Sequence, residues 1–244
     1  MTGLRPAPSG RRVLLLGLVA AGLLVTARSA WLLHQSSRLV QQAQARQARP
    51  AVPAQRLLVV GDSTAVGTGA SSAALSLVGL ISAAHPDWQI HNLAANGARF
   101  ADVARQLAMA QPGHDRVLVL AGGNDMIRLT GAAALQADIR RVVDLARHKG
   151  RRVVLMPAGS VGHAPFFWPP VAWWMDGRAR ALHALVRQAA QDSGAVYVRL
   201  LQPRDQDPFA QQPGLLHAAD GLHPSDAGYR LWYAALRAQG GLDG

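Results

Sequence analysis

Residues 57–70 read LLVVGDSTAVGTGA, an apolar run that stops at a glycine-rich polar segment. Four consecutive Leu and Val residues predict a strand buried on both faces, as in a parallel sheet. The glycines that follow allow a tight turn, which holds a serine out at the mouth of the sheet with its own N–H directed into the site. Ser63 is therefore a candidate nucleophile. A phosphate-binding loop is not favoured, because the Gly-Lys-Ser/Thr of a Walker loop and the dinucleotide spacing are both absent.

The rest of the chain after this strand alternates short apolar runs with longer helical patterns. Each predicted strand is followed by a predicted helix, which is typical of a parallel sheet covered on both faces. The strands are predicted at 57–60, 89–94, 117–121, 153–156 and 196–200, and the helices at about 70–84, 99–110, 132–149, 177–192 and 225–238. The fold class is therefore α/β with a five-stranded parallel sheet. Its chemistry is expected at the carboxyl ends of the strands.

The basic charge of the chain is concentrated at its N-terminus. The 244 residues carry a formal charge of +11, from 25 basic and 14 acidic residues. Seven of the arginines and none of the acids lie in residues 1–55, so the remaining chain has 18 basic against 14 acidic residues. No basic helix with interleaved aromatics is found, and nucleic acid is not expected as a partner. The absence of cysteine excludes a disulfide framework, a thiol nucleophile and a cysteine-bound metal.

The N-terminal segment has the pattern of an export signal. Arg11 and Arg12 precede the charge-free run VLLLGLVAAGLLVTA at 13–27, and a basic start before such a run is typical of a secretory signal. If Arg28 is tolerated, residues 13–33 form an uncleaved anchor. Both interpretations remain open, because small residues near 26–30 also suit a cleavage site.

Export implies that the folded domain lies outside the cytoplasmic membrane, since arginines at 5, 11 and 12 favour a cytoplasmic start. The domain would be anchored facing the periplasm or exterior, or periplasmic or secreted if the N-terminus is cleaved. We divide the chain into a signal peptide or signal anchor at 1–33, a helical stalk and extended linker at 34–55, and a folded domain at 56–244.

Two further segments offer hydrogen-bond donors at strand ends. NLAANG at 92–97 follows the second predicted strand, and GGND at 122–125 follows the third. A glycine presents an unobstructed backbone N–H and an asparagine a neutral side-chain N–H, and both suit a developing oxyanion. Gly97 and Asn124 are therefore candidate donors, although each such segment taken alone is also common in turns.

An acid and an imidazole lie three residues apart in DGLHP at 220–224, just before the last predicted helix. In this loop the carboxylate of Asp220 can reach Nδ1–H of His223 and leave Nε2 free as a base. With Ser63 these residues complete a Ser-His-Asp set. His217 is a spare candidate base, and Ser225 is expected to cap the last helix.

Five aromatic residues fall within residues 166–174, between the fourth predicted strand and its helix. Phe166, Phe167 and Trp168 are candidate substrate-binding residues, as the lining of an acyl pocket or as a lid. The same rings are also suited to contact a membrane surface near the anchor. Packing against the edge of the core explains them equally well.

Four segments together resemble the motifs of the SGNH, or GDSL-type, hydrolases, a family of esterases. They are GDSTAVGTGA at 61–70, NLAANG at 92–97, GGND at 122–125 and DGLHP at 220–224, in family order over about 190 residues. Each motif is weak alone, but the ordered set is specific. The resemblance implies a flavodoxin-like three-layer α/β/α fold, no metal and no organic cofactor.

The resemblance also implies a role for each matching residue. Ser63 is the nucleophile, His223 the base and Asp220 the acid that orients it, while Gly97, Asn124 and the N–H of Ser63 are the oxyanion donors. Thr64 stands where the family name has leucine, a common variation.

We therefore expect a serine esterase of the lysophospholipase or short-acyl carboxylesterase type, acting on a small-molecule or lipid ester. A carbohydrate O-acetylesterase acting on envelope glycans is an alternative that the same triad would serve. A membrane-tethered binding factor without turnover is a third, which the complete set of site residues disfavours.

Overall fold

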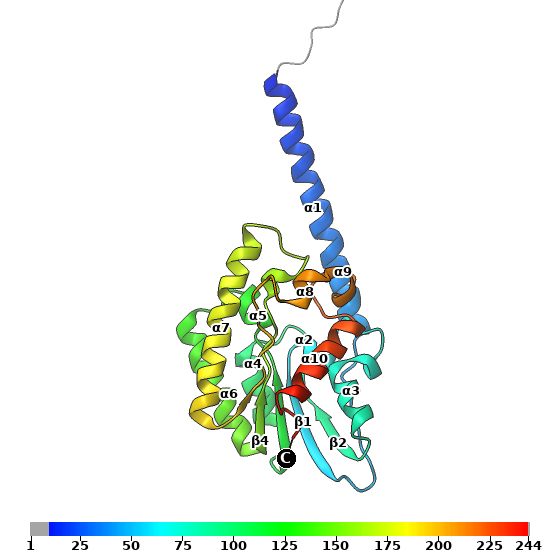
Figure 1. Cartoon of the computed structure of the whole chain (residues 1–244), viewed down its shortest axis with the longest axis vertical. Coiled ribbons are helices and arrows are strands. Elements are labelled where there is room, and N and C mark those ends of the chain that lie inside the picture. Colours follow the sequence, from blue (N-terminus) through cyan, green and yellow to red (C-terminus); the bar gives the residue numbers. More distant parts are fainter. Residues whose placement is uncertain (1–9, 244) are drawn as a thin grey trace, which may run out of the picture.

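Five parallel strands form the middle layer of the structure, a computed structural model that describes residues 10–243 (Figure 1). The sheet order is β2-β1-β3-β4-β5. The strands are β1 (Gln55–Gly61), β2 (Trp88–Asn92), β3 (His114–Leu120), β4 (Gly150–Leu155) and β5 (Val196–Tyr197). In this order the chain reverses direction across the sheet between β1 and β3. Ligands of open α/β sheets bind at such a switch point.

The apolar run of β1 is buried on both faces of the sheet, as predicted. Leu57 and Val59 belong to the core on one face, and Leu58 and Val60 to the core on the other. This alternation follows from the two-residue period of a strand.

Helices cover both faces of the sheet and complete the three layers. One face carries α4 (Phe100–Met109), α6 (Ala132–Lys149) and α7 (Val171–Ser193), and the other carries α3 (Leu77–Ala84) and α10 (Asp226–Ala238). Short helices lie in the connections: α2 (Ser63–Val66), η1 (Ala73–Leu75), α5 (Gly123–Ile127), η2 (Val161–His163), α8 (Pro208–Gln211) and α9 (Pro213–Leu216). The predicted α/β class and five-stranded parallel sheet are confirmed.

Two predicted elements differ in extent from those observed. The strand predicted at 196–200 ends at Tyr197, although the N–H of Val198 still donates to the carbonyl of Leu155 in β4. The N–H and carbonyl of Arg199, on the outer edge of the sheet, bond the side chain of Gln239. The helix predicted at 70–84 is divided into η1 and α3. Ser76 makes the division, since its hydroxyl accepts from the N–H of Gly79 and so caps a new helix start.

Helix α7 begins at Val171, six residues before the predicted start at 177. Pro170 occupies the N-cap position, and proline is compatible with a helix start but not with a helix interior. Trp173 and Trp174 therefore lie on the first turns of α7 and not in a loop. Ser225 caps α10 as predicted, accepting from the N–H of Gly228.

The N-terminal helix α1 (Gly10–Gln42) leaves the domain at the end where α8 and α9 lie (Figure 1). It is long and apolar enough to cross a membrane, a criterion that a secretory signal sequence also meets. Its second half packs on the domain, where Leu32 is buried and Asn96 Nδ2 donates to the carbonyl of Val40. Arg5, part of the predicted basic start, lies outside the described residues.

The segment after α1 forms no helix, and it lies against the edge of the sheet. Ala48 forms an antiparallel bridge with Ile90 of β2. The side chain of Gln47 donates to the carbonyl of Asn92 at 2.7 Å and accepts from its N–H at 3.0 Å. These contacts attach the linker to β2, the edge strand of the sheet.

Candidate active site

Ser63 lies at the carboxyl end of β1, on the first turn of the short helix α2. Asp62 caps this helix, because its Oδ1 accepts from the N–H of Thr64 at 2.9 Å and from the Thr64 hydroxyl at 2.7 Å. The N–H of Ser63 is at the first helical position, where a helix makes no internal hydrogen bond. The end of β1 and the capped start of α2 therefore fix both the hydroxyl and the N–H of Ser63 at the carboxyl end of the sheet.

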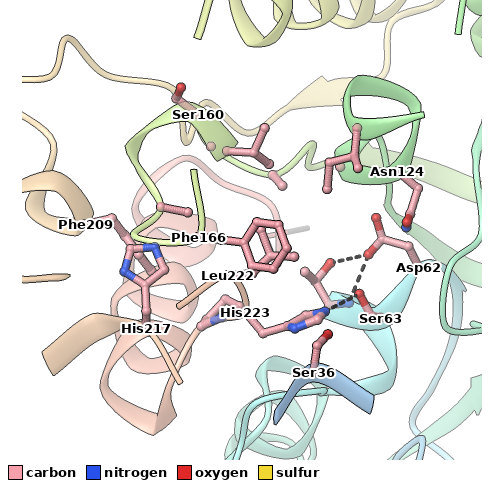
Figure 2. Close-up of a pocket in the computed structure, with 18 of the residues that line it drawn as sticks. Ser36, Asp62, Ser63, Asn124, Ser160, Phe166, Phe209, His217, Leu222 and His223 are labelled. Atoms are coloured by element: carbon pink, nitrogen blue, oxygen red, sulfur yellow. Dashed lines mark hydrogen bonds between the residues drawn. The ribbon is translucent and has the colours of Figure 1, made fainter. Parts of the chain in front are cut away.

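His223 approaches Ser63 from the loop before α10 (Figure 2), and Asp220 lies three residues earlier in the same loop. His223 Nε2 lies 2.9 Å from Ser63 Oγ, and His223 Nδ1 lies 2.6 Å from Asp220 Oδ2. Asp220 Oδ1 accepts from the backbone N–H of Leu222 at 3.0 Å and of His223 at 3.1 Å. Since an ionised carboxylate only accepts, Nδ1 carries the proton and Nε2 is free to accept from Ser63.

A close approach at Gly69 brings the histidine loop against the serine loop. Gly69 has a φ of +97°, and a Cβ at this position would lie 2.4 Å from the carbonyl oxygen of Pro224 and 2.9 Å from the Cβ of His223. A side chain would therefore separate the two loops. The glycine-rich sequence after β1 thus contributes to the contact between Ser63 and His223.

Burial and hydrogen bonds set opposite pKa shifts for the two aspartates of the site. Burial alone would raise the pKa of Asp220, but the His223 ring and the N–H groups of Leu222 and His223 lower it below its usual value. Burial raises the pKa of Asp62 to about 6, against the lowering effect of the bonds from Thr64. Asp220 is therefore held ionised beside the imidazole, which suits an orienting acid.

Gly97 and Asn124 line the same cavity as Ser63 and His223, in the connections after β2 and β3. Asn124 Nδ2 donates to the carbonyl of Ala98 at 3.2 Å, and an amide nitrogen has a second hydrogen to donate. Gly97 has a φ of +77°, a conformation that favours glycine. The connections after three neighbouring strands thus bring the three predicted donors to one cavity.

The cavity has a volume of about 380 Å³, within the range of small-molecule sites. One side is apolar, with Phe166 and Leu222 in its middle (Figure 2). The N–H of Phe166 donates to the carbonyl of Gly221 at 2.9 Å, which ties the aromatic segment to the loop that carries His223.

Of the three predicted substrate-binding aromatics, Phe166 lines the cavity and the other two do not. Phe167 packs edge-on against Phe166, with ring centroids 5.0 Å apart. Trp168 is 54% exposed, and the Arg28 guanidinium lies 5.0 Å from its ring centroid. Of the three aromatic residues, only Phe166 therefore remains a candidate for the lining of an acyl pocket.

Sequence reasoning missed the contribution of α1 to the cavity. Leu33, Ser36 and Val40 line it, although the sequence placed them in the anchor and the stalk. Their spacing of three and four residues puts them on one helix face, and this was the available signal. It was weak, because the adjoining apolar run accounts for the leucine and the valine equally well.

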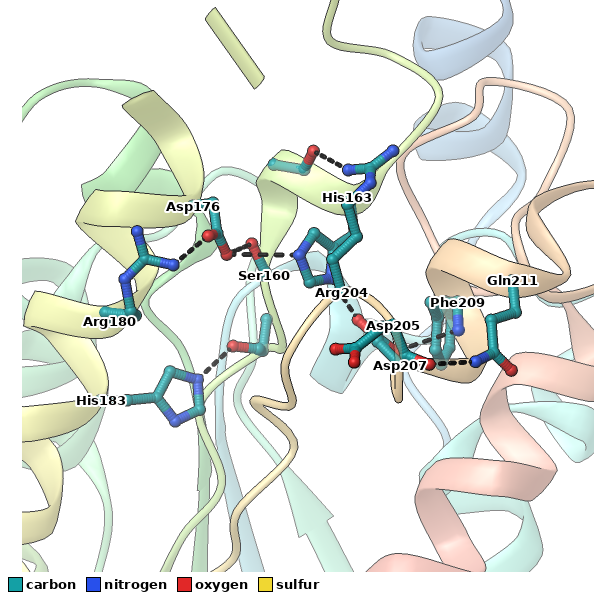
Figure 3. Close-up of polar contacts among 12 residues, drawn as sticks. Ser160, His163, Asp176, Arg180, His183, Arg204, Asp205, Asp207, Phe209 and Gln211 are labelled. Carbon is teal, nitrogen blue, oxygen red and sulfur yellow. Dashed lines mark hydrogen bonds and ion pairs between the residues drawn. The ribbon is translucent and has the colours of Figure 1, made fainter. Parts of the chain in front are cut away.

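A buried histidine between two carboxylates holds the segment before α7 in place (Figure 3). His163 Nδ1 lies 2.6 Å from Asp207 Oδ2, and His163 Nε2 lies 3.3 Å from Asp176 Oδ1. Ser160 Oγ donates to the same oxygen of Asp176 at 2.7 Å. These contacts join η2 to α7 and to the segment before α8, and so support the wall that contains Phe166.

His217, the spare candidate base, lies on the far side of Phe166 and Leu222 from Ser63 (Figure 2). Its ring packs edge-on against Phe209 at 5.1 Å, and burial lowers its pKa. It lines the cavity but is not placed beside the serine.

Comparison with known proteins shows the family to which the chain belongs. The model of the GDSL-like lipase/acylhydrolase family matches residues 59–231, which include all four motifs of the site. The chain belongs to this family. This GDSL-like hydrolase thus shares the family of lipases and acylhydrolases that the model describes. A GDSL-like esterase of Mycobacterium tuberculosis is 27% identical to it over 186 residues, covering 72% of this chain and 58% of the relative.

Solved structures of the family have the same fold as this GDSL-like hydrolase. TesA superposes with a TM-score of 0.60 at 22% identity, covering 76% of this chain and 98% of TesA. The acetylxylan esterase Axe2 of Geobacillus stearothermophilus superposes with a TM-score of 0.56 at 23% identity, covering 79% and 97%. At these identities the likeness establishes the SGNH hydrolase fold.

Proposed function

We propose that this GDSL-like hydrolase is a serine esterase in which Ser63 is the nucleophile, His223 the base and Asp220 the orienting acid. The hydrogen-bonded series Asp220, His223 and Ser63 at the cavity is the observation that carries the proposal, with distances of 2.6 and 2.9 Å. No other described histidine has both a carboxylate on one ring nitrogen and a serine hydroxyl on the other.

The reaction proceeds in two half-reactions of the same kind. His223 takes the Oγ proton of Ser63 as Oγ attacks the ester carbonyl carbon, and then gives this proton to the leaving alcohol as the C–O bond breaks. Water, deprotonated by His223, attacks the acyl-enzyme, and the acid leaves while Ser63 regains its proton. Asp220 keeps the imidazole in the required tautomer and stabilises the imidazolium.

The tetrahedral oxyanion receives hydrogen bonds from the N–H of Ser63, the N–H of Gly97 and Nδ2 of Asn124. These groups are fixed before the reaction by α2, by the turn after β2 and by the start of α5. Preorganised donors stabilise developing charge without reorganisation, which is usually the largest single contribution to catalysis.

The apolar side of the cavity favours a substrate with an aliphatic acyl group, of the lysophospholipase or short-acyl carboxylesterase type. Ile127, Val161, Phe166 and Leu222 all line this cavity. A site that recognises a carbohydrate needs placed polar groups to pair with sugar hydroxyls, and this side of the cavity offers none. Polar residues elsewhere in the lining, among them Ser160 and His217, are those that would serve the O-acetylesterase alternative.

For the N-terminus we propose a signal anchor that places the hydrolase domain, residues 56–244, outside the cytoplasmic membrane. Helix α1 is continuous through residues 26–30, whose small side chains also suit a cleavage site, and it reaches the domain beyond them. Arg28 donates to the carbonyl of Pro165, which removes it from the span and leaves the charge-free run 13–27. Snorkelling side chains and local thinning of the bilayer accommodate a span this short.

A chain-length series of p-nitrophenyl esters, from acetate to decanoate, tests the proposed function. We expect kcat/KM to rise beyond the acetate, and Ser63→Ala to lower kcat about 10⁴-fold or more on every ester. Ser160→Ala, which removes another hydroxyl of the cavity, is the matched control and should retain at least about a tenth of the activity. A maximum at the acetate would favour the O-acetylesterase alternative, and full activity in Ser63→Ala would refute the mechanism.

A further inference from the structure

The second half of α1 forms one side of the cavity that contains the catalytic residues. Leu33, Ser36 and Val40 line this cavity together with Ser63 and His223. The three positions recur at helical spacing, so that one face of α1 is turned toward the site. This helix precedes the family domain in sequence, yet it contributes to the same pocket.

Ser36 is the α1 residue that Figure 2 places beside the reacting groups. Its side chain lies below the Ser63–His223 pair in this view, on the opposite side from Ser160. A larger side chain at this position would extend into space that an ester bound at Ser63 needs. The size of residue 36 is therefore expected to limit which esters fit.

The first half of α1 continues away from the cavity, and its side chains are exposed wherever they are described between residues 14 and 27. Its described large apolar side chains are each more than half exposed: Leu14, Leu18, Val19, Leu23, Leu24 and Val25. Arg28 separates this exposed half from the packed half and contacts Pro165 and Trp168. At a rise of 1.5 Å per residue, Ser36 lies about 12 Å along the axis from Arg28.

Exposed tryptophans lie on the first turns of α7 and in the segment before it, where Trp168 contacts α1. Trp168, which stacks with Arg28, is 54% exposed, and Trp173 and Trp174 on the first turns of α7 are 67% and 51% exposed. Tryptophan is enriched at membrane–water interfaces, where its ring lies at the level of the headgroups. The first half of α1 and the start of α7 lie at the same end of the domain (Figure 1). The exposed apolar helix and the tryptophans therefore indicate the same occupant, a lipid surface.

We propose that the second half of α1 is a wall of the ester-binding pocket that selects the acyl chain, and that the pocket takes its ester from the membrane surface into which α1 extends. The substrate class is an ester of an aliphatic acid held in a lipid layer. Leu33 and Val40 supply the apolar contacts of this wall, and Ser36 supplies the space beside Ser63. The inference rests on the proposed function, since it takes Ser63 as the nucleophile.

The wall is tested with the full-length protein in detergent, by comparing Ser36→Phe with Ser37→Phe. Ser37 is the next residue on α1, is exposed and does not line the cavity. We expect Ser36→Phe to lower kcat/KM for p-nitrophenyl decanoate relative to the acetate by about tenfold or more, and Ser37→Phe to change this ratio less than twofold. Equal effects of the two variants would overturn the assignment of the wall.

A second pair keeps the test decisive if Ser36→Phe does not fold. Leu33→Ala, compared with Leu39→Ala outside this cavity, should lower the decanoate-to-acetate ratio about threefold or more. Labelling of Ser63 by a small fluorophosphonate distinguishes a failure of the proposed function from a failure of the proposed α1 wall. Parent protein that hydrolyses the esters without Ser63 labelling contradicts the proposed function, whereas normal labelling with unchanged ratios in Leu33→Ala contradicts the wall alone.

The membrane source is tested with full-length protein in phosphatidylethanolamine and phosphatidylglycerol vesicles that contain a long-chain acyl ester of a fluorescent alcohol. Trp173→Ala is compared with Met109→Ala, since Met109 is 71% exposed but lies at the end of α4 that leads to the start of β3. Trp173→Ala should lower the rate on the vesicle ester, relative to a soluble acetate, about threefold or more. An equal ratio in the two variants would exclude the membrane as the source.

Discussion

Replacing Asp220 by Asn tests whether the carboxylate sets the tautomer of His223. The amide oxygen of Asn can still accept from the backbone N–H groups of Leu222 and His223, as Oδ1 does now at 3.0 and 3.1 Å. The amide nitrogen then replaces Oδ2, 2.6 Å from His223 Nδ1, and it can only donate. Nδ1 must become the acceptor, and the ring proton moves to Nε2.

A proton on Nε2 points at Ser63 Oγ and removes the base. The backbone geometry is retained, so the loss should appear in kcat and be about 10⁴-fold, the order of magnitude seen when a triad aspartate of serine proteases is changed in this way. The assay is the steady-state hydrolysis of p-nitrophenyl butyrate by the parent and Asp220→Asn, with thermal unfolding measured on both.

The structure contains a matched control in the second histidine–aspartate pair. Asp207 Oδ2 lies 2.6 Å from His163 Nδ1, and its Oδ1 accepts from the backbone N–H of Phe209 at 3.0 Å. Asp207→Asn therefore disturbs an equally short contact with a similar backbone bond, at a residue that lines the cavity but pairs with His163 and not with His223. We expect it to lower the melting temperature and to keep kcat within about tenfold. A loss in Asp220→Asn no greater than in Asp207→Asn would refute the role assigned to Asp220.

Three further variants test other parts of the site. Asn124→Ala should lower kcat on the order of 10²–10³-fold with little change in KM, because the bond forms chiefly in the transition state, and an unchanged kcat would reduce Asn124 to a turn residue. Asp62, with a pKa raised by burial from 3.8 to about 6, holds a proton in the folded chain that the unfolded chain has released, so its contribution to stability is present below pH 4 and is lost as the pH rises to 6. Urea unfolding at pH 4 to 7 should therefore show the stability of Asp62→Asn rising relative to the parent by about 2 kcal/mol, and a difference independent of pH would show that the pKa is not raised. Phe166→Ala should weaken decanoate hydrolysis more than acetate hydrolysis, by ~0.8 kcal/mol per methylene that loses contact, while the neighbouring Phe167→Ala should affect both esters alike.

The parts of the fold that depend on local patterns could be predicted from the sequence. The run Leu57–Val60 predicted a buried parallel strand, and the four motifs located Ser63, Gly97, Asn124 and His223, which the fold brings to one cavity. These features are readable because a two-residue period and a glycine-rich turn are local properties. Val171 as the start of α7 was missed, since the aromatic run before residue 177 has no helical pattern and Pro169-Pro170 marks the start only in retrospect.

Contacts between distant segments could not be predicted in the same way. A membrane anchor accounts for the apolar side chains of Leu33 and Val40 in α1 as well as a place in the cavity does. Nothing in the sequence therefore assigned these residues to the cavity. His163 and Asp207 are 44 residues apart, and neither belongs to a motif. Their pairing is a consequence of how the segments around β4, α7 and α8 pack, which depends on the whole domain rather than on local spacing.

Covalent labelling of the full-length protein tests the central assignment most directly. A fluorophosphonate reacts with a serine only where a neighbouring base and an oxyanion site activate it. We predict one equivalent of adduct, located on Ser63 by peptide mass spectrometry, with esterase activity falling in proportion to the labelled fraction and no adduct in His223→Ala. Complete loss of activity with Ser63 unmodified, or a labelled Ser63 with full activity, would contradict the account.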